Sequence, residues 1–188
     1  VIKPRDKKSN YVKRALGIPG DTIEIKDGIV FVNGKKNILP DRAKPIFTYN
    51  IKSEQGVSSN KLKEIGIEGF IRKFTIKNLT QRSYEEISNY ILSISNTNDN
   101  EYLIYTDDSG IPLSIIRDNN IIISELIDSK KEISLTYEDA FKIENSNLFD
   151  TIYRVTQSKG VSNLNFFPNN NNFKWNNDYL GPLYIPKK

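Results

Sequence analysis

The sequence predicts an α+β fold that is mainly antiparallel β, and three observations carry this prediction. Short segments alternate polar and apolar residues, as Thr22 to Ile25 do, which is typical of half-buried strands. Turn dipeptides such as Asp27-Gly28 separate these segments and favour tight hairpins. A few segments instead begin with helix-capping residues. We therefore expect antiparallel strands interrupted by short helices.

The first third of the chain is expected to contain a strand, a turn and a hairpin. The strand spans residues 11–16 and leads to Pro19-Gly20, which favours a type II turn because glycine accepts a positive φ after proline. The apolar segment 29–32 follows the Asp27-Gly28 turn, and Asn33-Gly34 forms the next turn. Residues 22–35 are therefore expected to form a β-hairpin.

The rest of the chain mixes short helices with strands. Expected helices are one through residue 66 capped by Ser59, one over 83–94 begun by a Ser83–Glu86 capping box, and one over 137–145 capped by Thr136. The expected strands span residues 46–52, 70–77, 102–106, 113–117, 121–127, 132–135 and 150–156. From about residue 160 the chain becomes rich in Asn, Pro and aromatic residues, which indicates an extended connector.

Composition excludes several classes of chemistry. The 188 residues include no Cys and no His, which excludes disulfides, thiolate nucleophiles and histidine bases, so we expect no cofactor and no metal site. The net charge of +4 is dispersed along the chain, so a nucleic-acid partner is not expected. No apolar run approaches the ~20 residues of a membrane span. Because methionine is also absent, we interpret the chain as an excised or processed product.

Lys13 interrupts an otherwise largely apolar strand. Strand alternation places it on the same face as Tyr11 and Ala15, an arrangement that allows burial. Burial lowers the pKa of a lysine, and a neutral lysine can accept a proton from a serine hydroxyl in place of histidine. In the alternative interpretation, Lys13 and Arg14 are solvated charges that protect an exposed edge strand.

The stretch from Tyr11 to Asp21, Tyr-Val-Lys-Arg-Ala-Leu-Gly-Ile-Pro-Gly-Asp, resembles the lysine motif of type I bacterial signal peptidases. The family pattern ends in Gly-Leu-Pro-Gly-Asp, and Ile18 stands here in place of the leucine. Residues 29–35 look like the hairpin return of the family, which commonly ends in Asn-Gly. Residues 175–188 are similar, more weakly, to a stretch found in one bacterial branch of the family.

The resemblance implies a membrane-anchored serine endopeptidase with a Ser/Lys dyad. Such enzymes remove signal peptides from exported preproteins on the outer, periplasmic face of the bacterial cytoplasmic membrane. Lys13 falls on the general base and Arg14 adjoins it. The resemblance also implies a scaffolding turn that holds the lysine strand in place, formed by Gly17, Pro19, Gly20 and Asp21. The partners implied are preproteins that carry signal peptides and, through the parent protein, a lipid surface. The oligomeric state stays open.

The chain also departs from the family pattern. The family serine lies upstream in a Ser-Met-x-Pro-Thr segment, and a Gly-Asp-Asn-Arg box comes last, but neither occurs here; Ser9 has no such surroundings. We therefore expect a segment without the serine, inactive alone, whose anchor lies outside these residues. The expected domains are 1–35, the lysine strand and hairpin of an incomplete catalytic sheet; 36–160, an inserted α+β cap; and 161–188, a segment returning toward the catalytic sheet.

Two alternatives stay open for the function. In the first alternative, the insertion is a non-catalytic module that binds preprotein, lipid or a secretion partner. In the second, the whole protein is a degenerate signal peptidase homologue that lost its serine. Other conspicuous residues are expected to be structural. Asp107, Asp108 and Asp118 lie in expected turns, with a metal site as the alternative. The aromatic residues Phe166, Phe167, Phe173 and Trp175 are expected to be core or cover residues of the connector, with a ligand-stacking surface or lipid contact as the alternatives.

Overall fold

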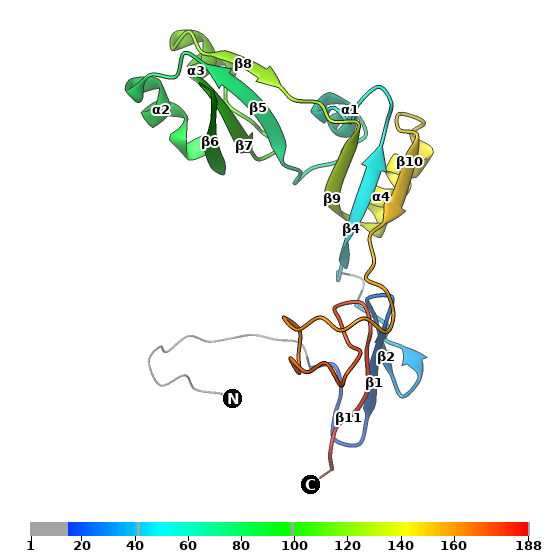
Figure 1. Ribbon diagram of the computed structural model, residues 1–188. Helices are drawn as coiled ribbons and strands as arrows, with labels where there is room; N and C mark the ends of the chain where they lie inside the picture. The colour runs from blue at the N-terminus through cyan, green and yellow to red at the C-terminus, as the bar shows by residue number, and fades with distance from the viewer. Residues whose placement is uncertain (1–14, 41, 99, 188) are drawn as a thin grey trace. The chain divides into compact units, whose positions relative to one another are not determined.

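The structure, a computed structural model, describes residues 15–40, 42–98 and 100–187. The chain divides into two compact units: unit 1 comprises residues 1–41 and 156–188, and unit 2 comprises residues 42–155. The described residues form antiparallel sheets with a few short helices, which confirms the predicted α+β, mainly β class (Figure 1). The strand expected over 11–16 lies almost entirely outside the described residues.

Unit 1 contains one small sheet with the strand order β11-β1-β2-β3. Its strands are β1 (Thr22–Lys26), β2 (Ile29–Val32), β3 (Lys35–Lys36) and β11 (Leu180–Tyr184). The predicted hairpin is confirmed. Asp27 and Gly28 connect β1 to β2 with φ angles of 52° and 68°, the two positive values that a tight hairpin turn of this twist needs.

The first sheet of unit 2 has the order β10-β4-β9. It consists of β10 (Thr151–Arg154), β4 (Ile46–Lys52) and β9 (Lys130–Thr136), and both α1 (Ser59–Glu64) and α4 (Tyr137–Asn145) contribute side chains to its core. Helix α4 packs against all three strands. The buried apolar core of this part comprises Tyr49, Ile51, Val57, Leu62, Ile67, Phe70, Ile133, Leu135, Ala140 and Ile143.

The second sheet of unit 2 has the order β6-β7-β5-β8. It consists of β6 (Ser93–Asn98), β7 (Glu101–Thr106), β5 (Arg72–Lys77) and β8 (Ile122–Glu125), together with α2 (Gln81–Ile87), the 3₁₀ helix η1 (Ser88–Tyr90) and α3 (Leu113–Asp118). Its buried apolar core comprises Phe74, Ile76, Ile87, Ile104, Ile111 and Ile121.

The structure corrects one strand. Residues 113–117, predicted as a strand, form helix α3. Its Ile-Ile pair has high β-propensity, but Ile115 and Ile116 both pack against the core of the second sheet, and that tertiary contact overrides the local preference. The helix ends at Asp118, and its C-cap Asn119 donates its amide proton to Arg117 O and Ile115 O.

The structure also corrects two helix starts. Ser58, not Ser59, caps α1 by accepting a hydrogen bond from the Lys61 amide. Thr80 caps α2 in a reciprocal capping box with Ser83, so Ser83 is the third helical residue and not the cap. The helix predicted over 83–94 ends at Ile87 and continues only as η1. By contrast, α4 and its Thr136 cap lie where they were predicted.

Candidate functional site

The residues singled out by the lysine motif divide into two groups. Lys13 and Arg14 lie outside the described residues. The others, from Gly17 to Asp21, form a turn that leads into β1. The Asp21 amide donates to the Ile18 carbonyl at 3.0 Å and Gly20 has a φ of 101°, as expected for a Pro-Gly turn. This turn sets the direction in which the chain enters the sheet.

The Asp21 carboxylate joins this turn to the second turn of the hairpin. Its Oδ2 accepts from the Ile18 amide at 2.9 Å, and its Oδ1 accepts from Asn33 Nδ2 at 2.8 Å. The Asn33 Oδ1 in turn accepts from the Thr22 amide at 2.9 Å. The hydrogen bond from the Ile18 backbone, followed by that from Asn33, lowers the pKa of Asp21 below its ordinary value. The turn is thus fixed by a carboxylate whose ionised form is stabilised by these hydrogen bonds.

Strand β11 and the residues after it lie antiparallel to this segment. Gly20 donates its amide proton to Ile185 O, and Ile185 donates to Asp21 O, each at 2.8 Å. Ile23 of β1 pairs with Leu183, and a bulge follows between Ile23 and Ile25. At Gly181 an added Cβ would lie 2.5 Å from the Ile23 carbonyl oxygen, so only glycine fits there. The chain therefore returns from far along the sequence to cover the edge of β1.

Asn176 organises the loop that leads into β11. Its side chain is 1% exposed, and its Nδ2 donates to the carbonyl oxygens of Ser158 and Val161 at 3.0 and 2.8 Å. Its Oδ1 accepts from the amides of Asp178 and Tyr179, both at 3.0 Å. The Tyr179 hydroxyl donates to the Asp27 carboxylate, which ties this loop to the hairpin.

The aromatic residues of this loop are less covered than predicted. Trp175 is half-buried and its ring lies 4.6 Å from that of Phe173. Phe167 is 61% exposed, and Phe173 is exposed as well, as are Val161 and Leu164. The expectation that these aromatic residues form a cover is therefore wrong for Phe167 and Phe173. The loop holds them at the surface instead.

Unit 2 contains a cluster of charged groups that sequence reasoning missed. Glu125 accepts from Arg72 Nη2 at 2.9 Å and also from the Ser59 hydroxyl. Burial raises the pKa of Glu125, but the hydrogen bonds from Arg72 and Ser59 outweigh burial, so the pKa is lowered overall. Ser59 is fully buried and bonded to a carboxylate, so its hydroxyl is not available to a peptide substrate. We assign the cluster a structural role.

Two of the three aspartates predicted in turns, Asp107 and Asp108, act within loops, whereas Asp118 is the last residue of helix α3. Asp107 Oδ1 accepts from the amides of Ser109 and Gly110, which is the pattern of a side chain stabilising its own turn. Asp108 accepts from the Gly69 amide at 2.8 Å. Within the described part of the chain, no group of three acidic residues is arranged to hold a metal ion.

Comparisons with known proteins agree with the lysine motif. Residues 1–86 match a protein family described as signal peptidase, peptidase S26. Signal peptidase IB of Staphylococcus aureus is 41% identical over 56 residues, which is 30% of this chain and 27% of the relative. Signal peptidase I P of Bacillus subtilis subsp. natto is 56% identical over 36 residues, 19% of this chain and 20% of the relative. No solved structure matches the chain significantly.

Residues 1–86 of the chain are therefore similar to the signal peptidase, peptidase S26 family. The relatives named above are both type I signal peptidases, and the similarity to them is confined to short aligned regions. Their aligned regions span only 20% to 27% of each relative's length. The match runs past Lys35, the last residue of the N-terminal motifs, into α2 of unit 2. In the described residues we find no helix with the length and apolarity of a bilayer span.

Proposed function

We propose that the chain is part of a signal peptidase I that removes signal peptides from exported preproteins with a Ser/Lys dyad. The observation that carries this proposal is the lysine motif, because it lies inside the segment that matches the family. The turn from Gly17 to Asp21 supports it, since a carboxylate and a returning strand hold the chain in a defined geometry where the motif enters the sheet.

Lys13 is the general base in this proposal. The neutral amine takes the hydroxyl proton of the serine while the serine oxygen attacks the scissile carbonyl. The resulting ammonium then gives a proton to the departing amine, and water later cleaves the acyl-enzyme ester. Arg14 supports Lys13 electrostatically. The serine belongs to sequence outside these 188 residues, so the chain alone is inactive. The enzyme works on the periplasmic face of the membrane.

This proposal is tested by comparing this chain with the product of its complete reading frame. Both proteins are incubated with a preprotein, and cleavage is followed by the release of mature protein. We expect the complete product to cleave after the signal peptide and this chain to give no cleavage. Cleavage by this chain alone would disprove the claim that the nucleophilic serine lies outside these 188 residues. If neither protein cleaves, the degenerate-homologue interpretation replaces the enzyme.

The exposed loop of unit 1 favours a second function, contact with a lipid surface. Residues 157–177 contain two lysines, Lys159 and Lys174, and no Asp or Glu. The same segment exposes Phe167, Phe173 and Leu164. Exposed aromatic and aliphatic side chains next to basic groups are the combination that binds anionic bilayer surfaces.

Vesicle flotation tests the lipid contact. We expect the chain to float with vesicles that contain phosphatidylglycerol and to float less with pure phosphatidylcholine. Phe167→Ser should reduce flotation severalfold. Phe141→Ser, which changes an equally exposed phenylalanine of unit 2, serves as the control. Absence of flotation, or equal loss in both variants, would rule out this loop as a lipid site.

A further inference from the structure

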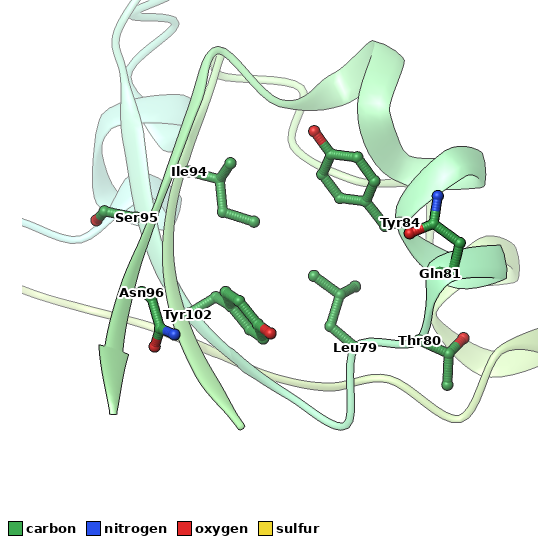
Figure 2. A pocket seen from close by; sticks show the side chains of 8 residues that line it. All are labelled: Leu79, Thr80, Gln81, Tyr84, Ile94, Ser95, Asn96 and Tyr102. Carbon is green, nitrogen blue, oxygen red and sulfur yellow. The ribbon is translucent and has the colours of Figure 1, made fainter. Parts of the chain in front are cut away.

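A groove lies between helix α2 and strands β6 and β7 of unit 2 (Figure 2). Its volume is about 310 Å³, at the lower end of the range of ligand pockets. The residues that line it are Leu79, Thr80, Gln81, Tyr84, Ile94, Ser95, Asn96 and Tyr102. Neither the signal peptidase motif nor the turn that follows it contributes to this groove.

The floor and the walls of the groove are apolar. Leu79 and Ile94 pack against the buried core of the second sheet and form the floor. The ring of Tyr84 comes from α2 and the ring of Tyr102 from β7, and both point toward the space between them (Figure 2). Tyr84 is 38% exposed, so part of its ring is available for contact. The space between the two rings is therefore bounded by apolar groups.

The rim of the groove is polar and uncharged. None of the eight lining residues, all within the described chain, carries a charge. The nearby carboxylate of Glu85 accepts a hydrogen bond from Gln81 Nε2 at 2.9 Å. Hydroxyl and amide groups hydrogen-bond to neutral partners without desolvating an ion, and a charged ligand would find no opposite charge among the eight lining residues. The lining thus favours an uncharged ligand.

The groove adjoins a free strand edge. Strand β6 is the last strand of its sheet, and among the described residues it pairs with β7 alone. An edge strand presents one row of unpaired amide and carbonyl groups. Ile94 and Asn96, two positions apart on β6, both line the groove. A strand added beside β6 would therefore direct alternate side chains toward it.

We propose that this groove and the β6 edge bind an uncharged, extended peptide segment of a partner protein. The peptide adds as a strand to β6 and places one apolar side chain between Tyr84 and Tyr102. Backbone hydrogen bonds provide much of the affinity, and the apolar floor selects the side chain. This binding site goes beyond the proposed peptidase and does not depend on it.

The test is an amide NMR titration of the chain with the peptide acetyl-Thr-Val-Ser-Tyr-Thr-Val-Ser-amide. We expect saturable shifts at β6, α2 and β7 and none in the sheet of β4, β9 and β10. Tyr84→Ala should weaken binding about tenfold, since the wall of the groove is lost. The matched control is Tyr90→Ala, which removes another 38% exposed tyrosine and should change affinity less than twofold.

Two further peptides test strand addition itself. N-methylation along one edge of the peptide should abolish binding, whereas N-methylation along the opposite edge should be tolerated, because only one edge faces β6. Replacing both Val residues with Glu should also abolish binding. The proposal is overturned if no saturable shifts occur, if both methylated peptides bind equally, or if the Glu peptide binds as well as the neutral one.

Discussion

Unit 1 and unit 2 are held together in different ways. Among the described residues, every buried apolar side chain belongs to unit 2, where each of the two sheets has its own apolar core. In unit 1 the buried residue is a polar one, Asn176, and the structure rests on strand pairing and on the side chains of Asp21 and Asn33. The unit that carries the lysine motif is thus organised chiefly by hydrogen bonds.

This difference has an energetic consequence. Fully burying one aliphatic side chain stabilises a fold by about 1.5–3 kcal/mol, whereas one net hydrogen bond contributes about 0.5–1.5 kcal/mol. Hydrogen bonds nevertheless specify direction, which apolar contacts do not. We therefore expect unit 1 to be well defined in geometry but to open more readily than unit 2, with faster amide exchange in β1 and β2 than in β5 and β7.

The largest effect is expected in the core of unit 2. Ile104→Ala removes a fully buried side chain of β7 that pairs with Phe74, and should lower the free energy of unfolding by about 2–5 kcal/mol. Urea denaturation measures this loss. Ile122→Ala, at an exposed position of β8, should change the free energy by less than about 0.5 kcal/mol. Equal effects of the two changes would contradict the assigned core.

A smaller effect is expected where β11 meets β1. Gly181→Ala places a methyl group against the Ile23 carbonyl and strains a residue with a φ of 94°, so it should cost roughly 1–3 kcal/mol of local stability. Gly160→Ala imposes a similar strain at a φ of 83°, but no atom lies within 4 Å of its added Cβ. Amide exchange in β1 should accelerate in the first variant more than in the second. The reverse order would show that β11 does not stabilise β1.

The smallest of these effects concerns the charged cluster of unit 2. Glu125→Gln should cost about 1–2 kcal/mol at pH 7, since it weakens the hydrogen bonds from Arg72 and Ser59. The folded-state pKa of Glu125 is lowered, so its contribution is complete above the unfolded pKa of about 4.3 and is lost as the pH falls through the folded value. Urea denaturation at pH 7 and pH 3 should show the difference between wild type and variant shrinking in acid. A constant difference would contradict the pKa shift.

The sequence predicted those elements that local chemistry determines. Asp27-Gly28 set the hairpin because both residues accept a positive φ, and Thr136 set the start of α4 because its hydroxyl accepts from the Asp139 amide at 3.1 Å. Residues 113–117 were predicted wrongly because the packing of Ile115 and Ile116, which lies in the tertiary structure, outweighs local propensity.

The candidate sites show the same limit. The lysine motif was recognisable as a contiguous run, and Pro19-Gly20 indicated its turn. The partners of that turn, Asn33 and Ile185, were not recognised, because distant residues meet only in the fold. The groove beside β6 is assembled from α2, β6 and β7, so no contiguous sequence pattern predicts it.

The central claim is that Lys13 acts as the general base of a signal peptidase, and one measurement tests it most directly. In the product of the complete reading frame, the rate of preprotein cleavage is compared between wild type, Lys13→Ala and the control Lys35→Ala, which changes an exposed lysine of unit 1. Lys13→Ala should lower the rate about 10²–10⁴-fold, the usual contribution of a general base, while the control stays near wild type. Equal cleavage by all three proteins would contradict the account.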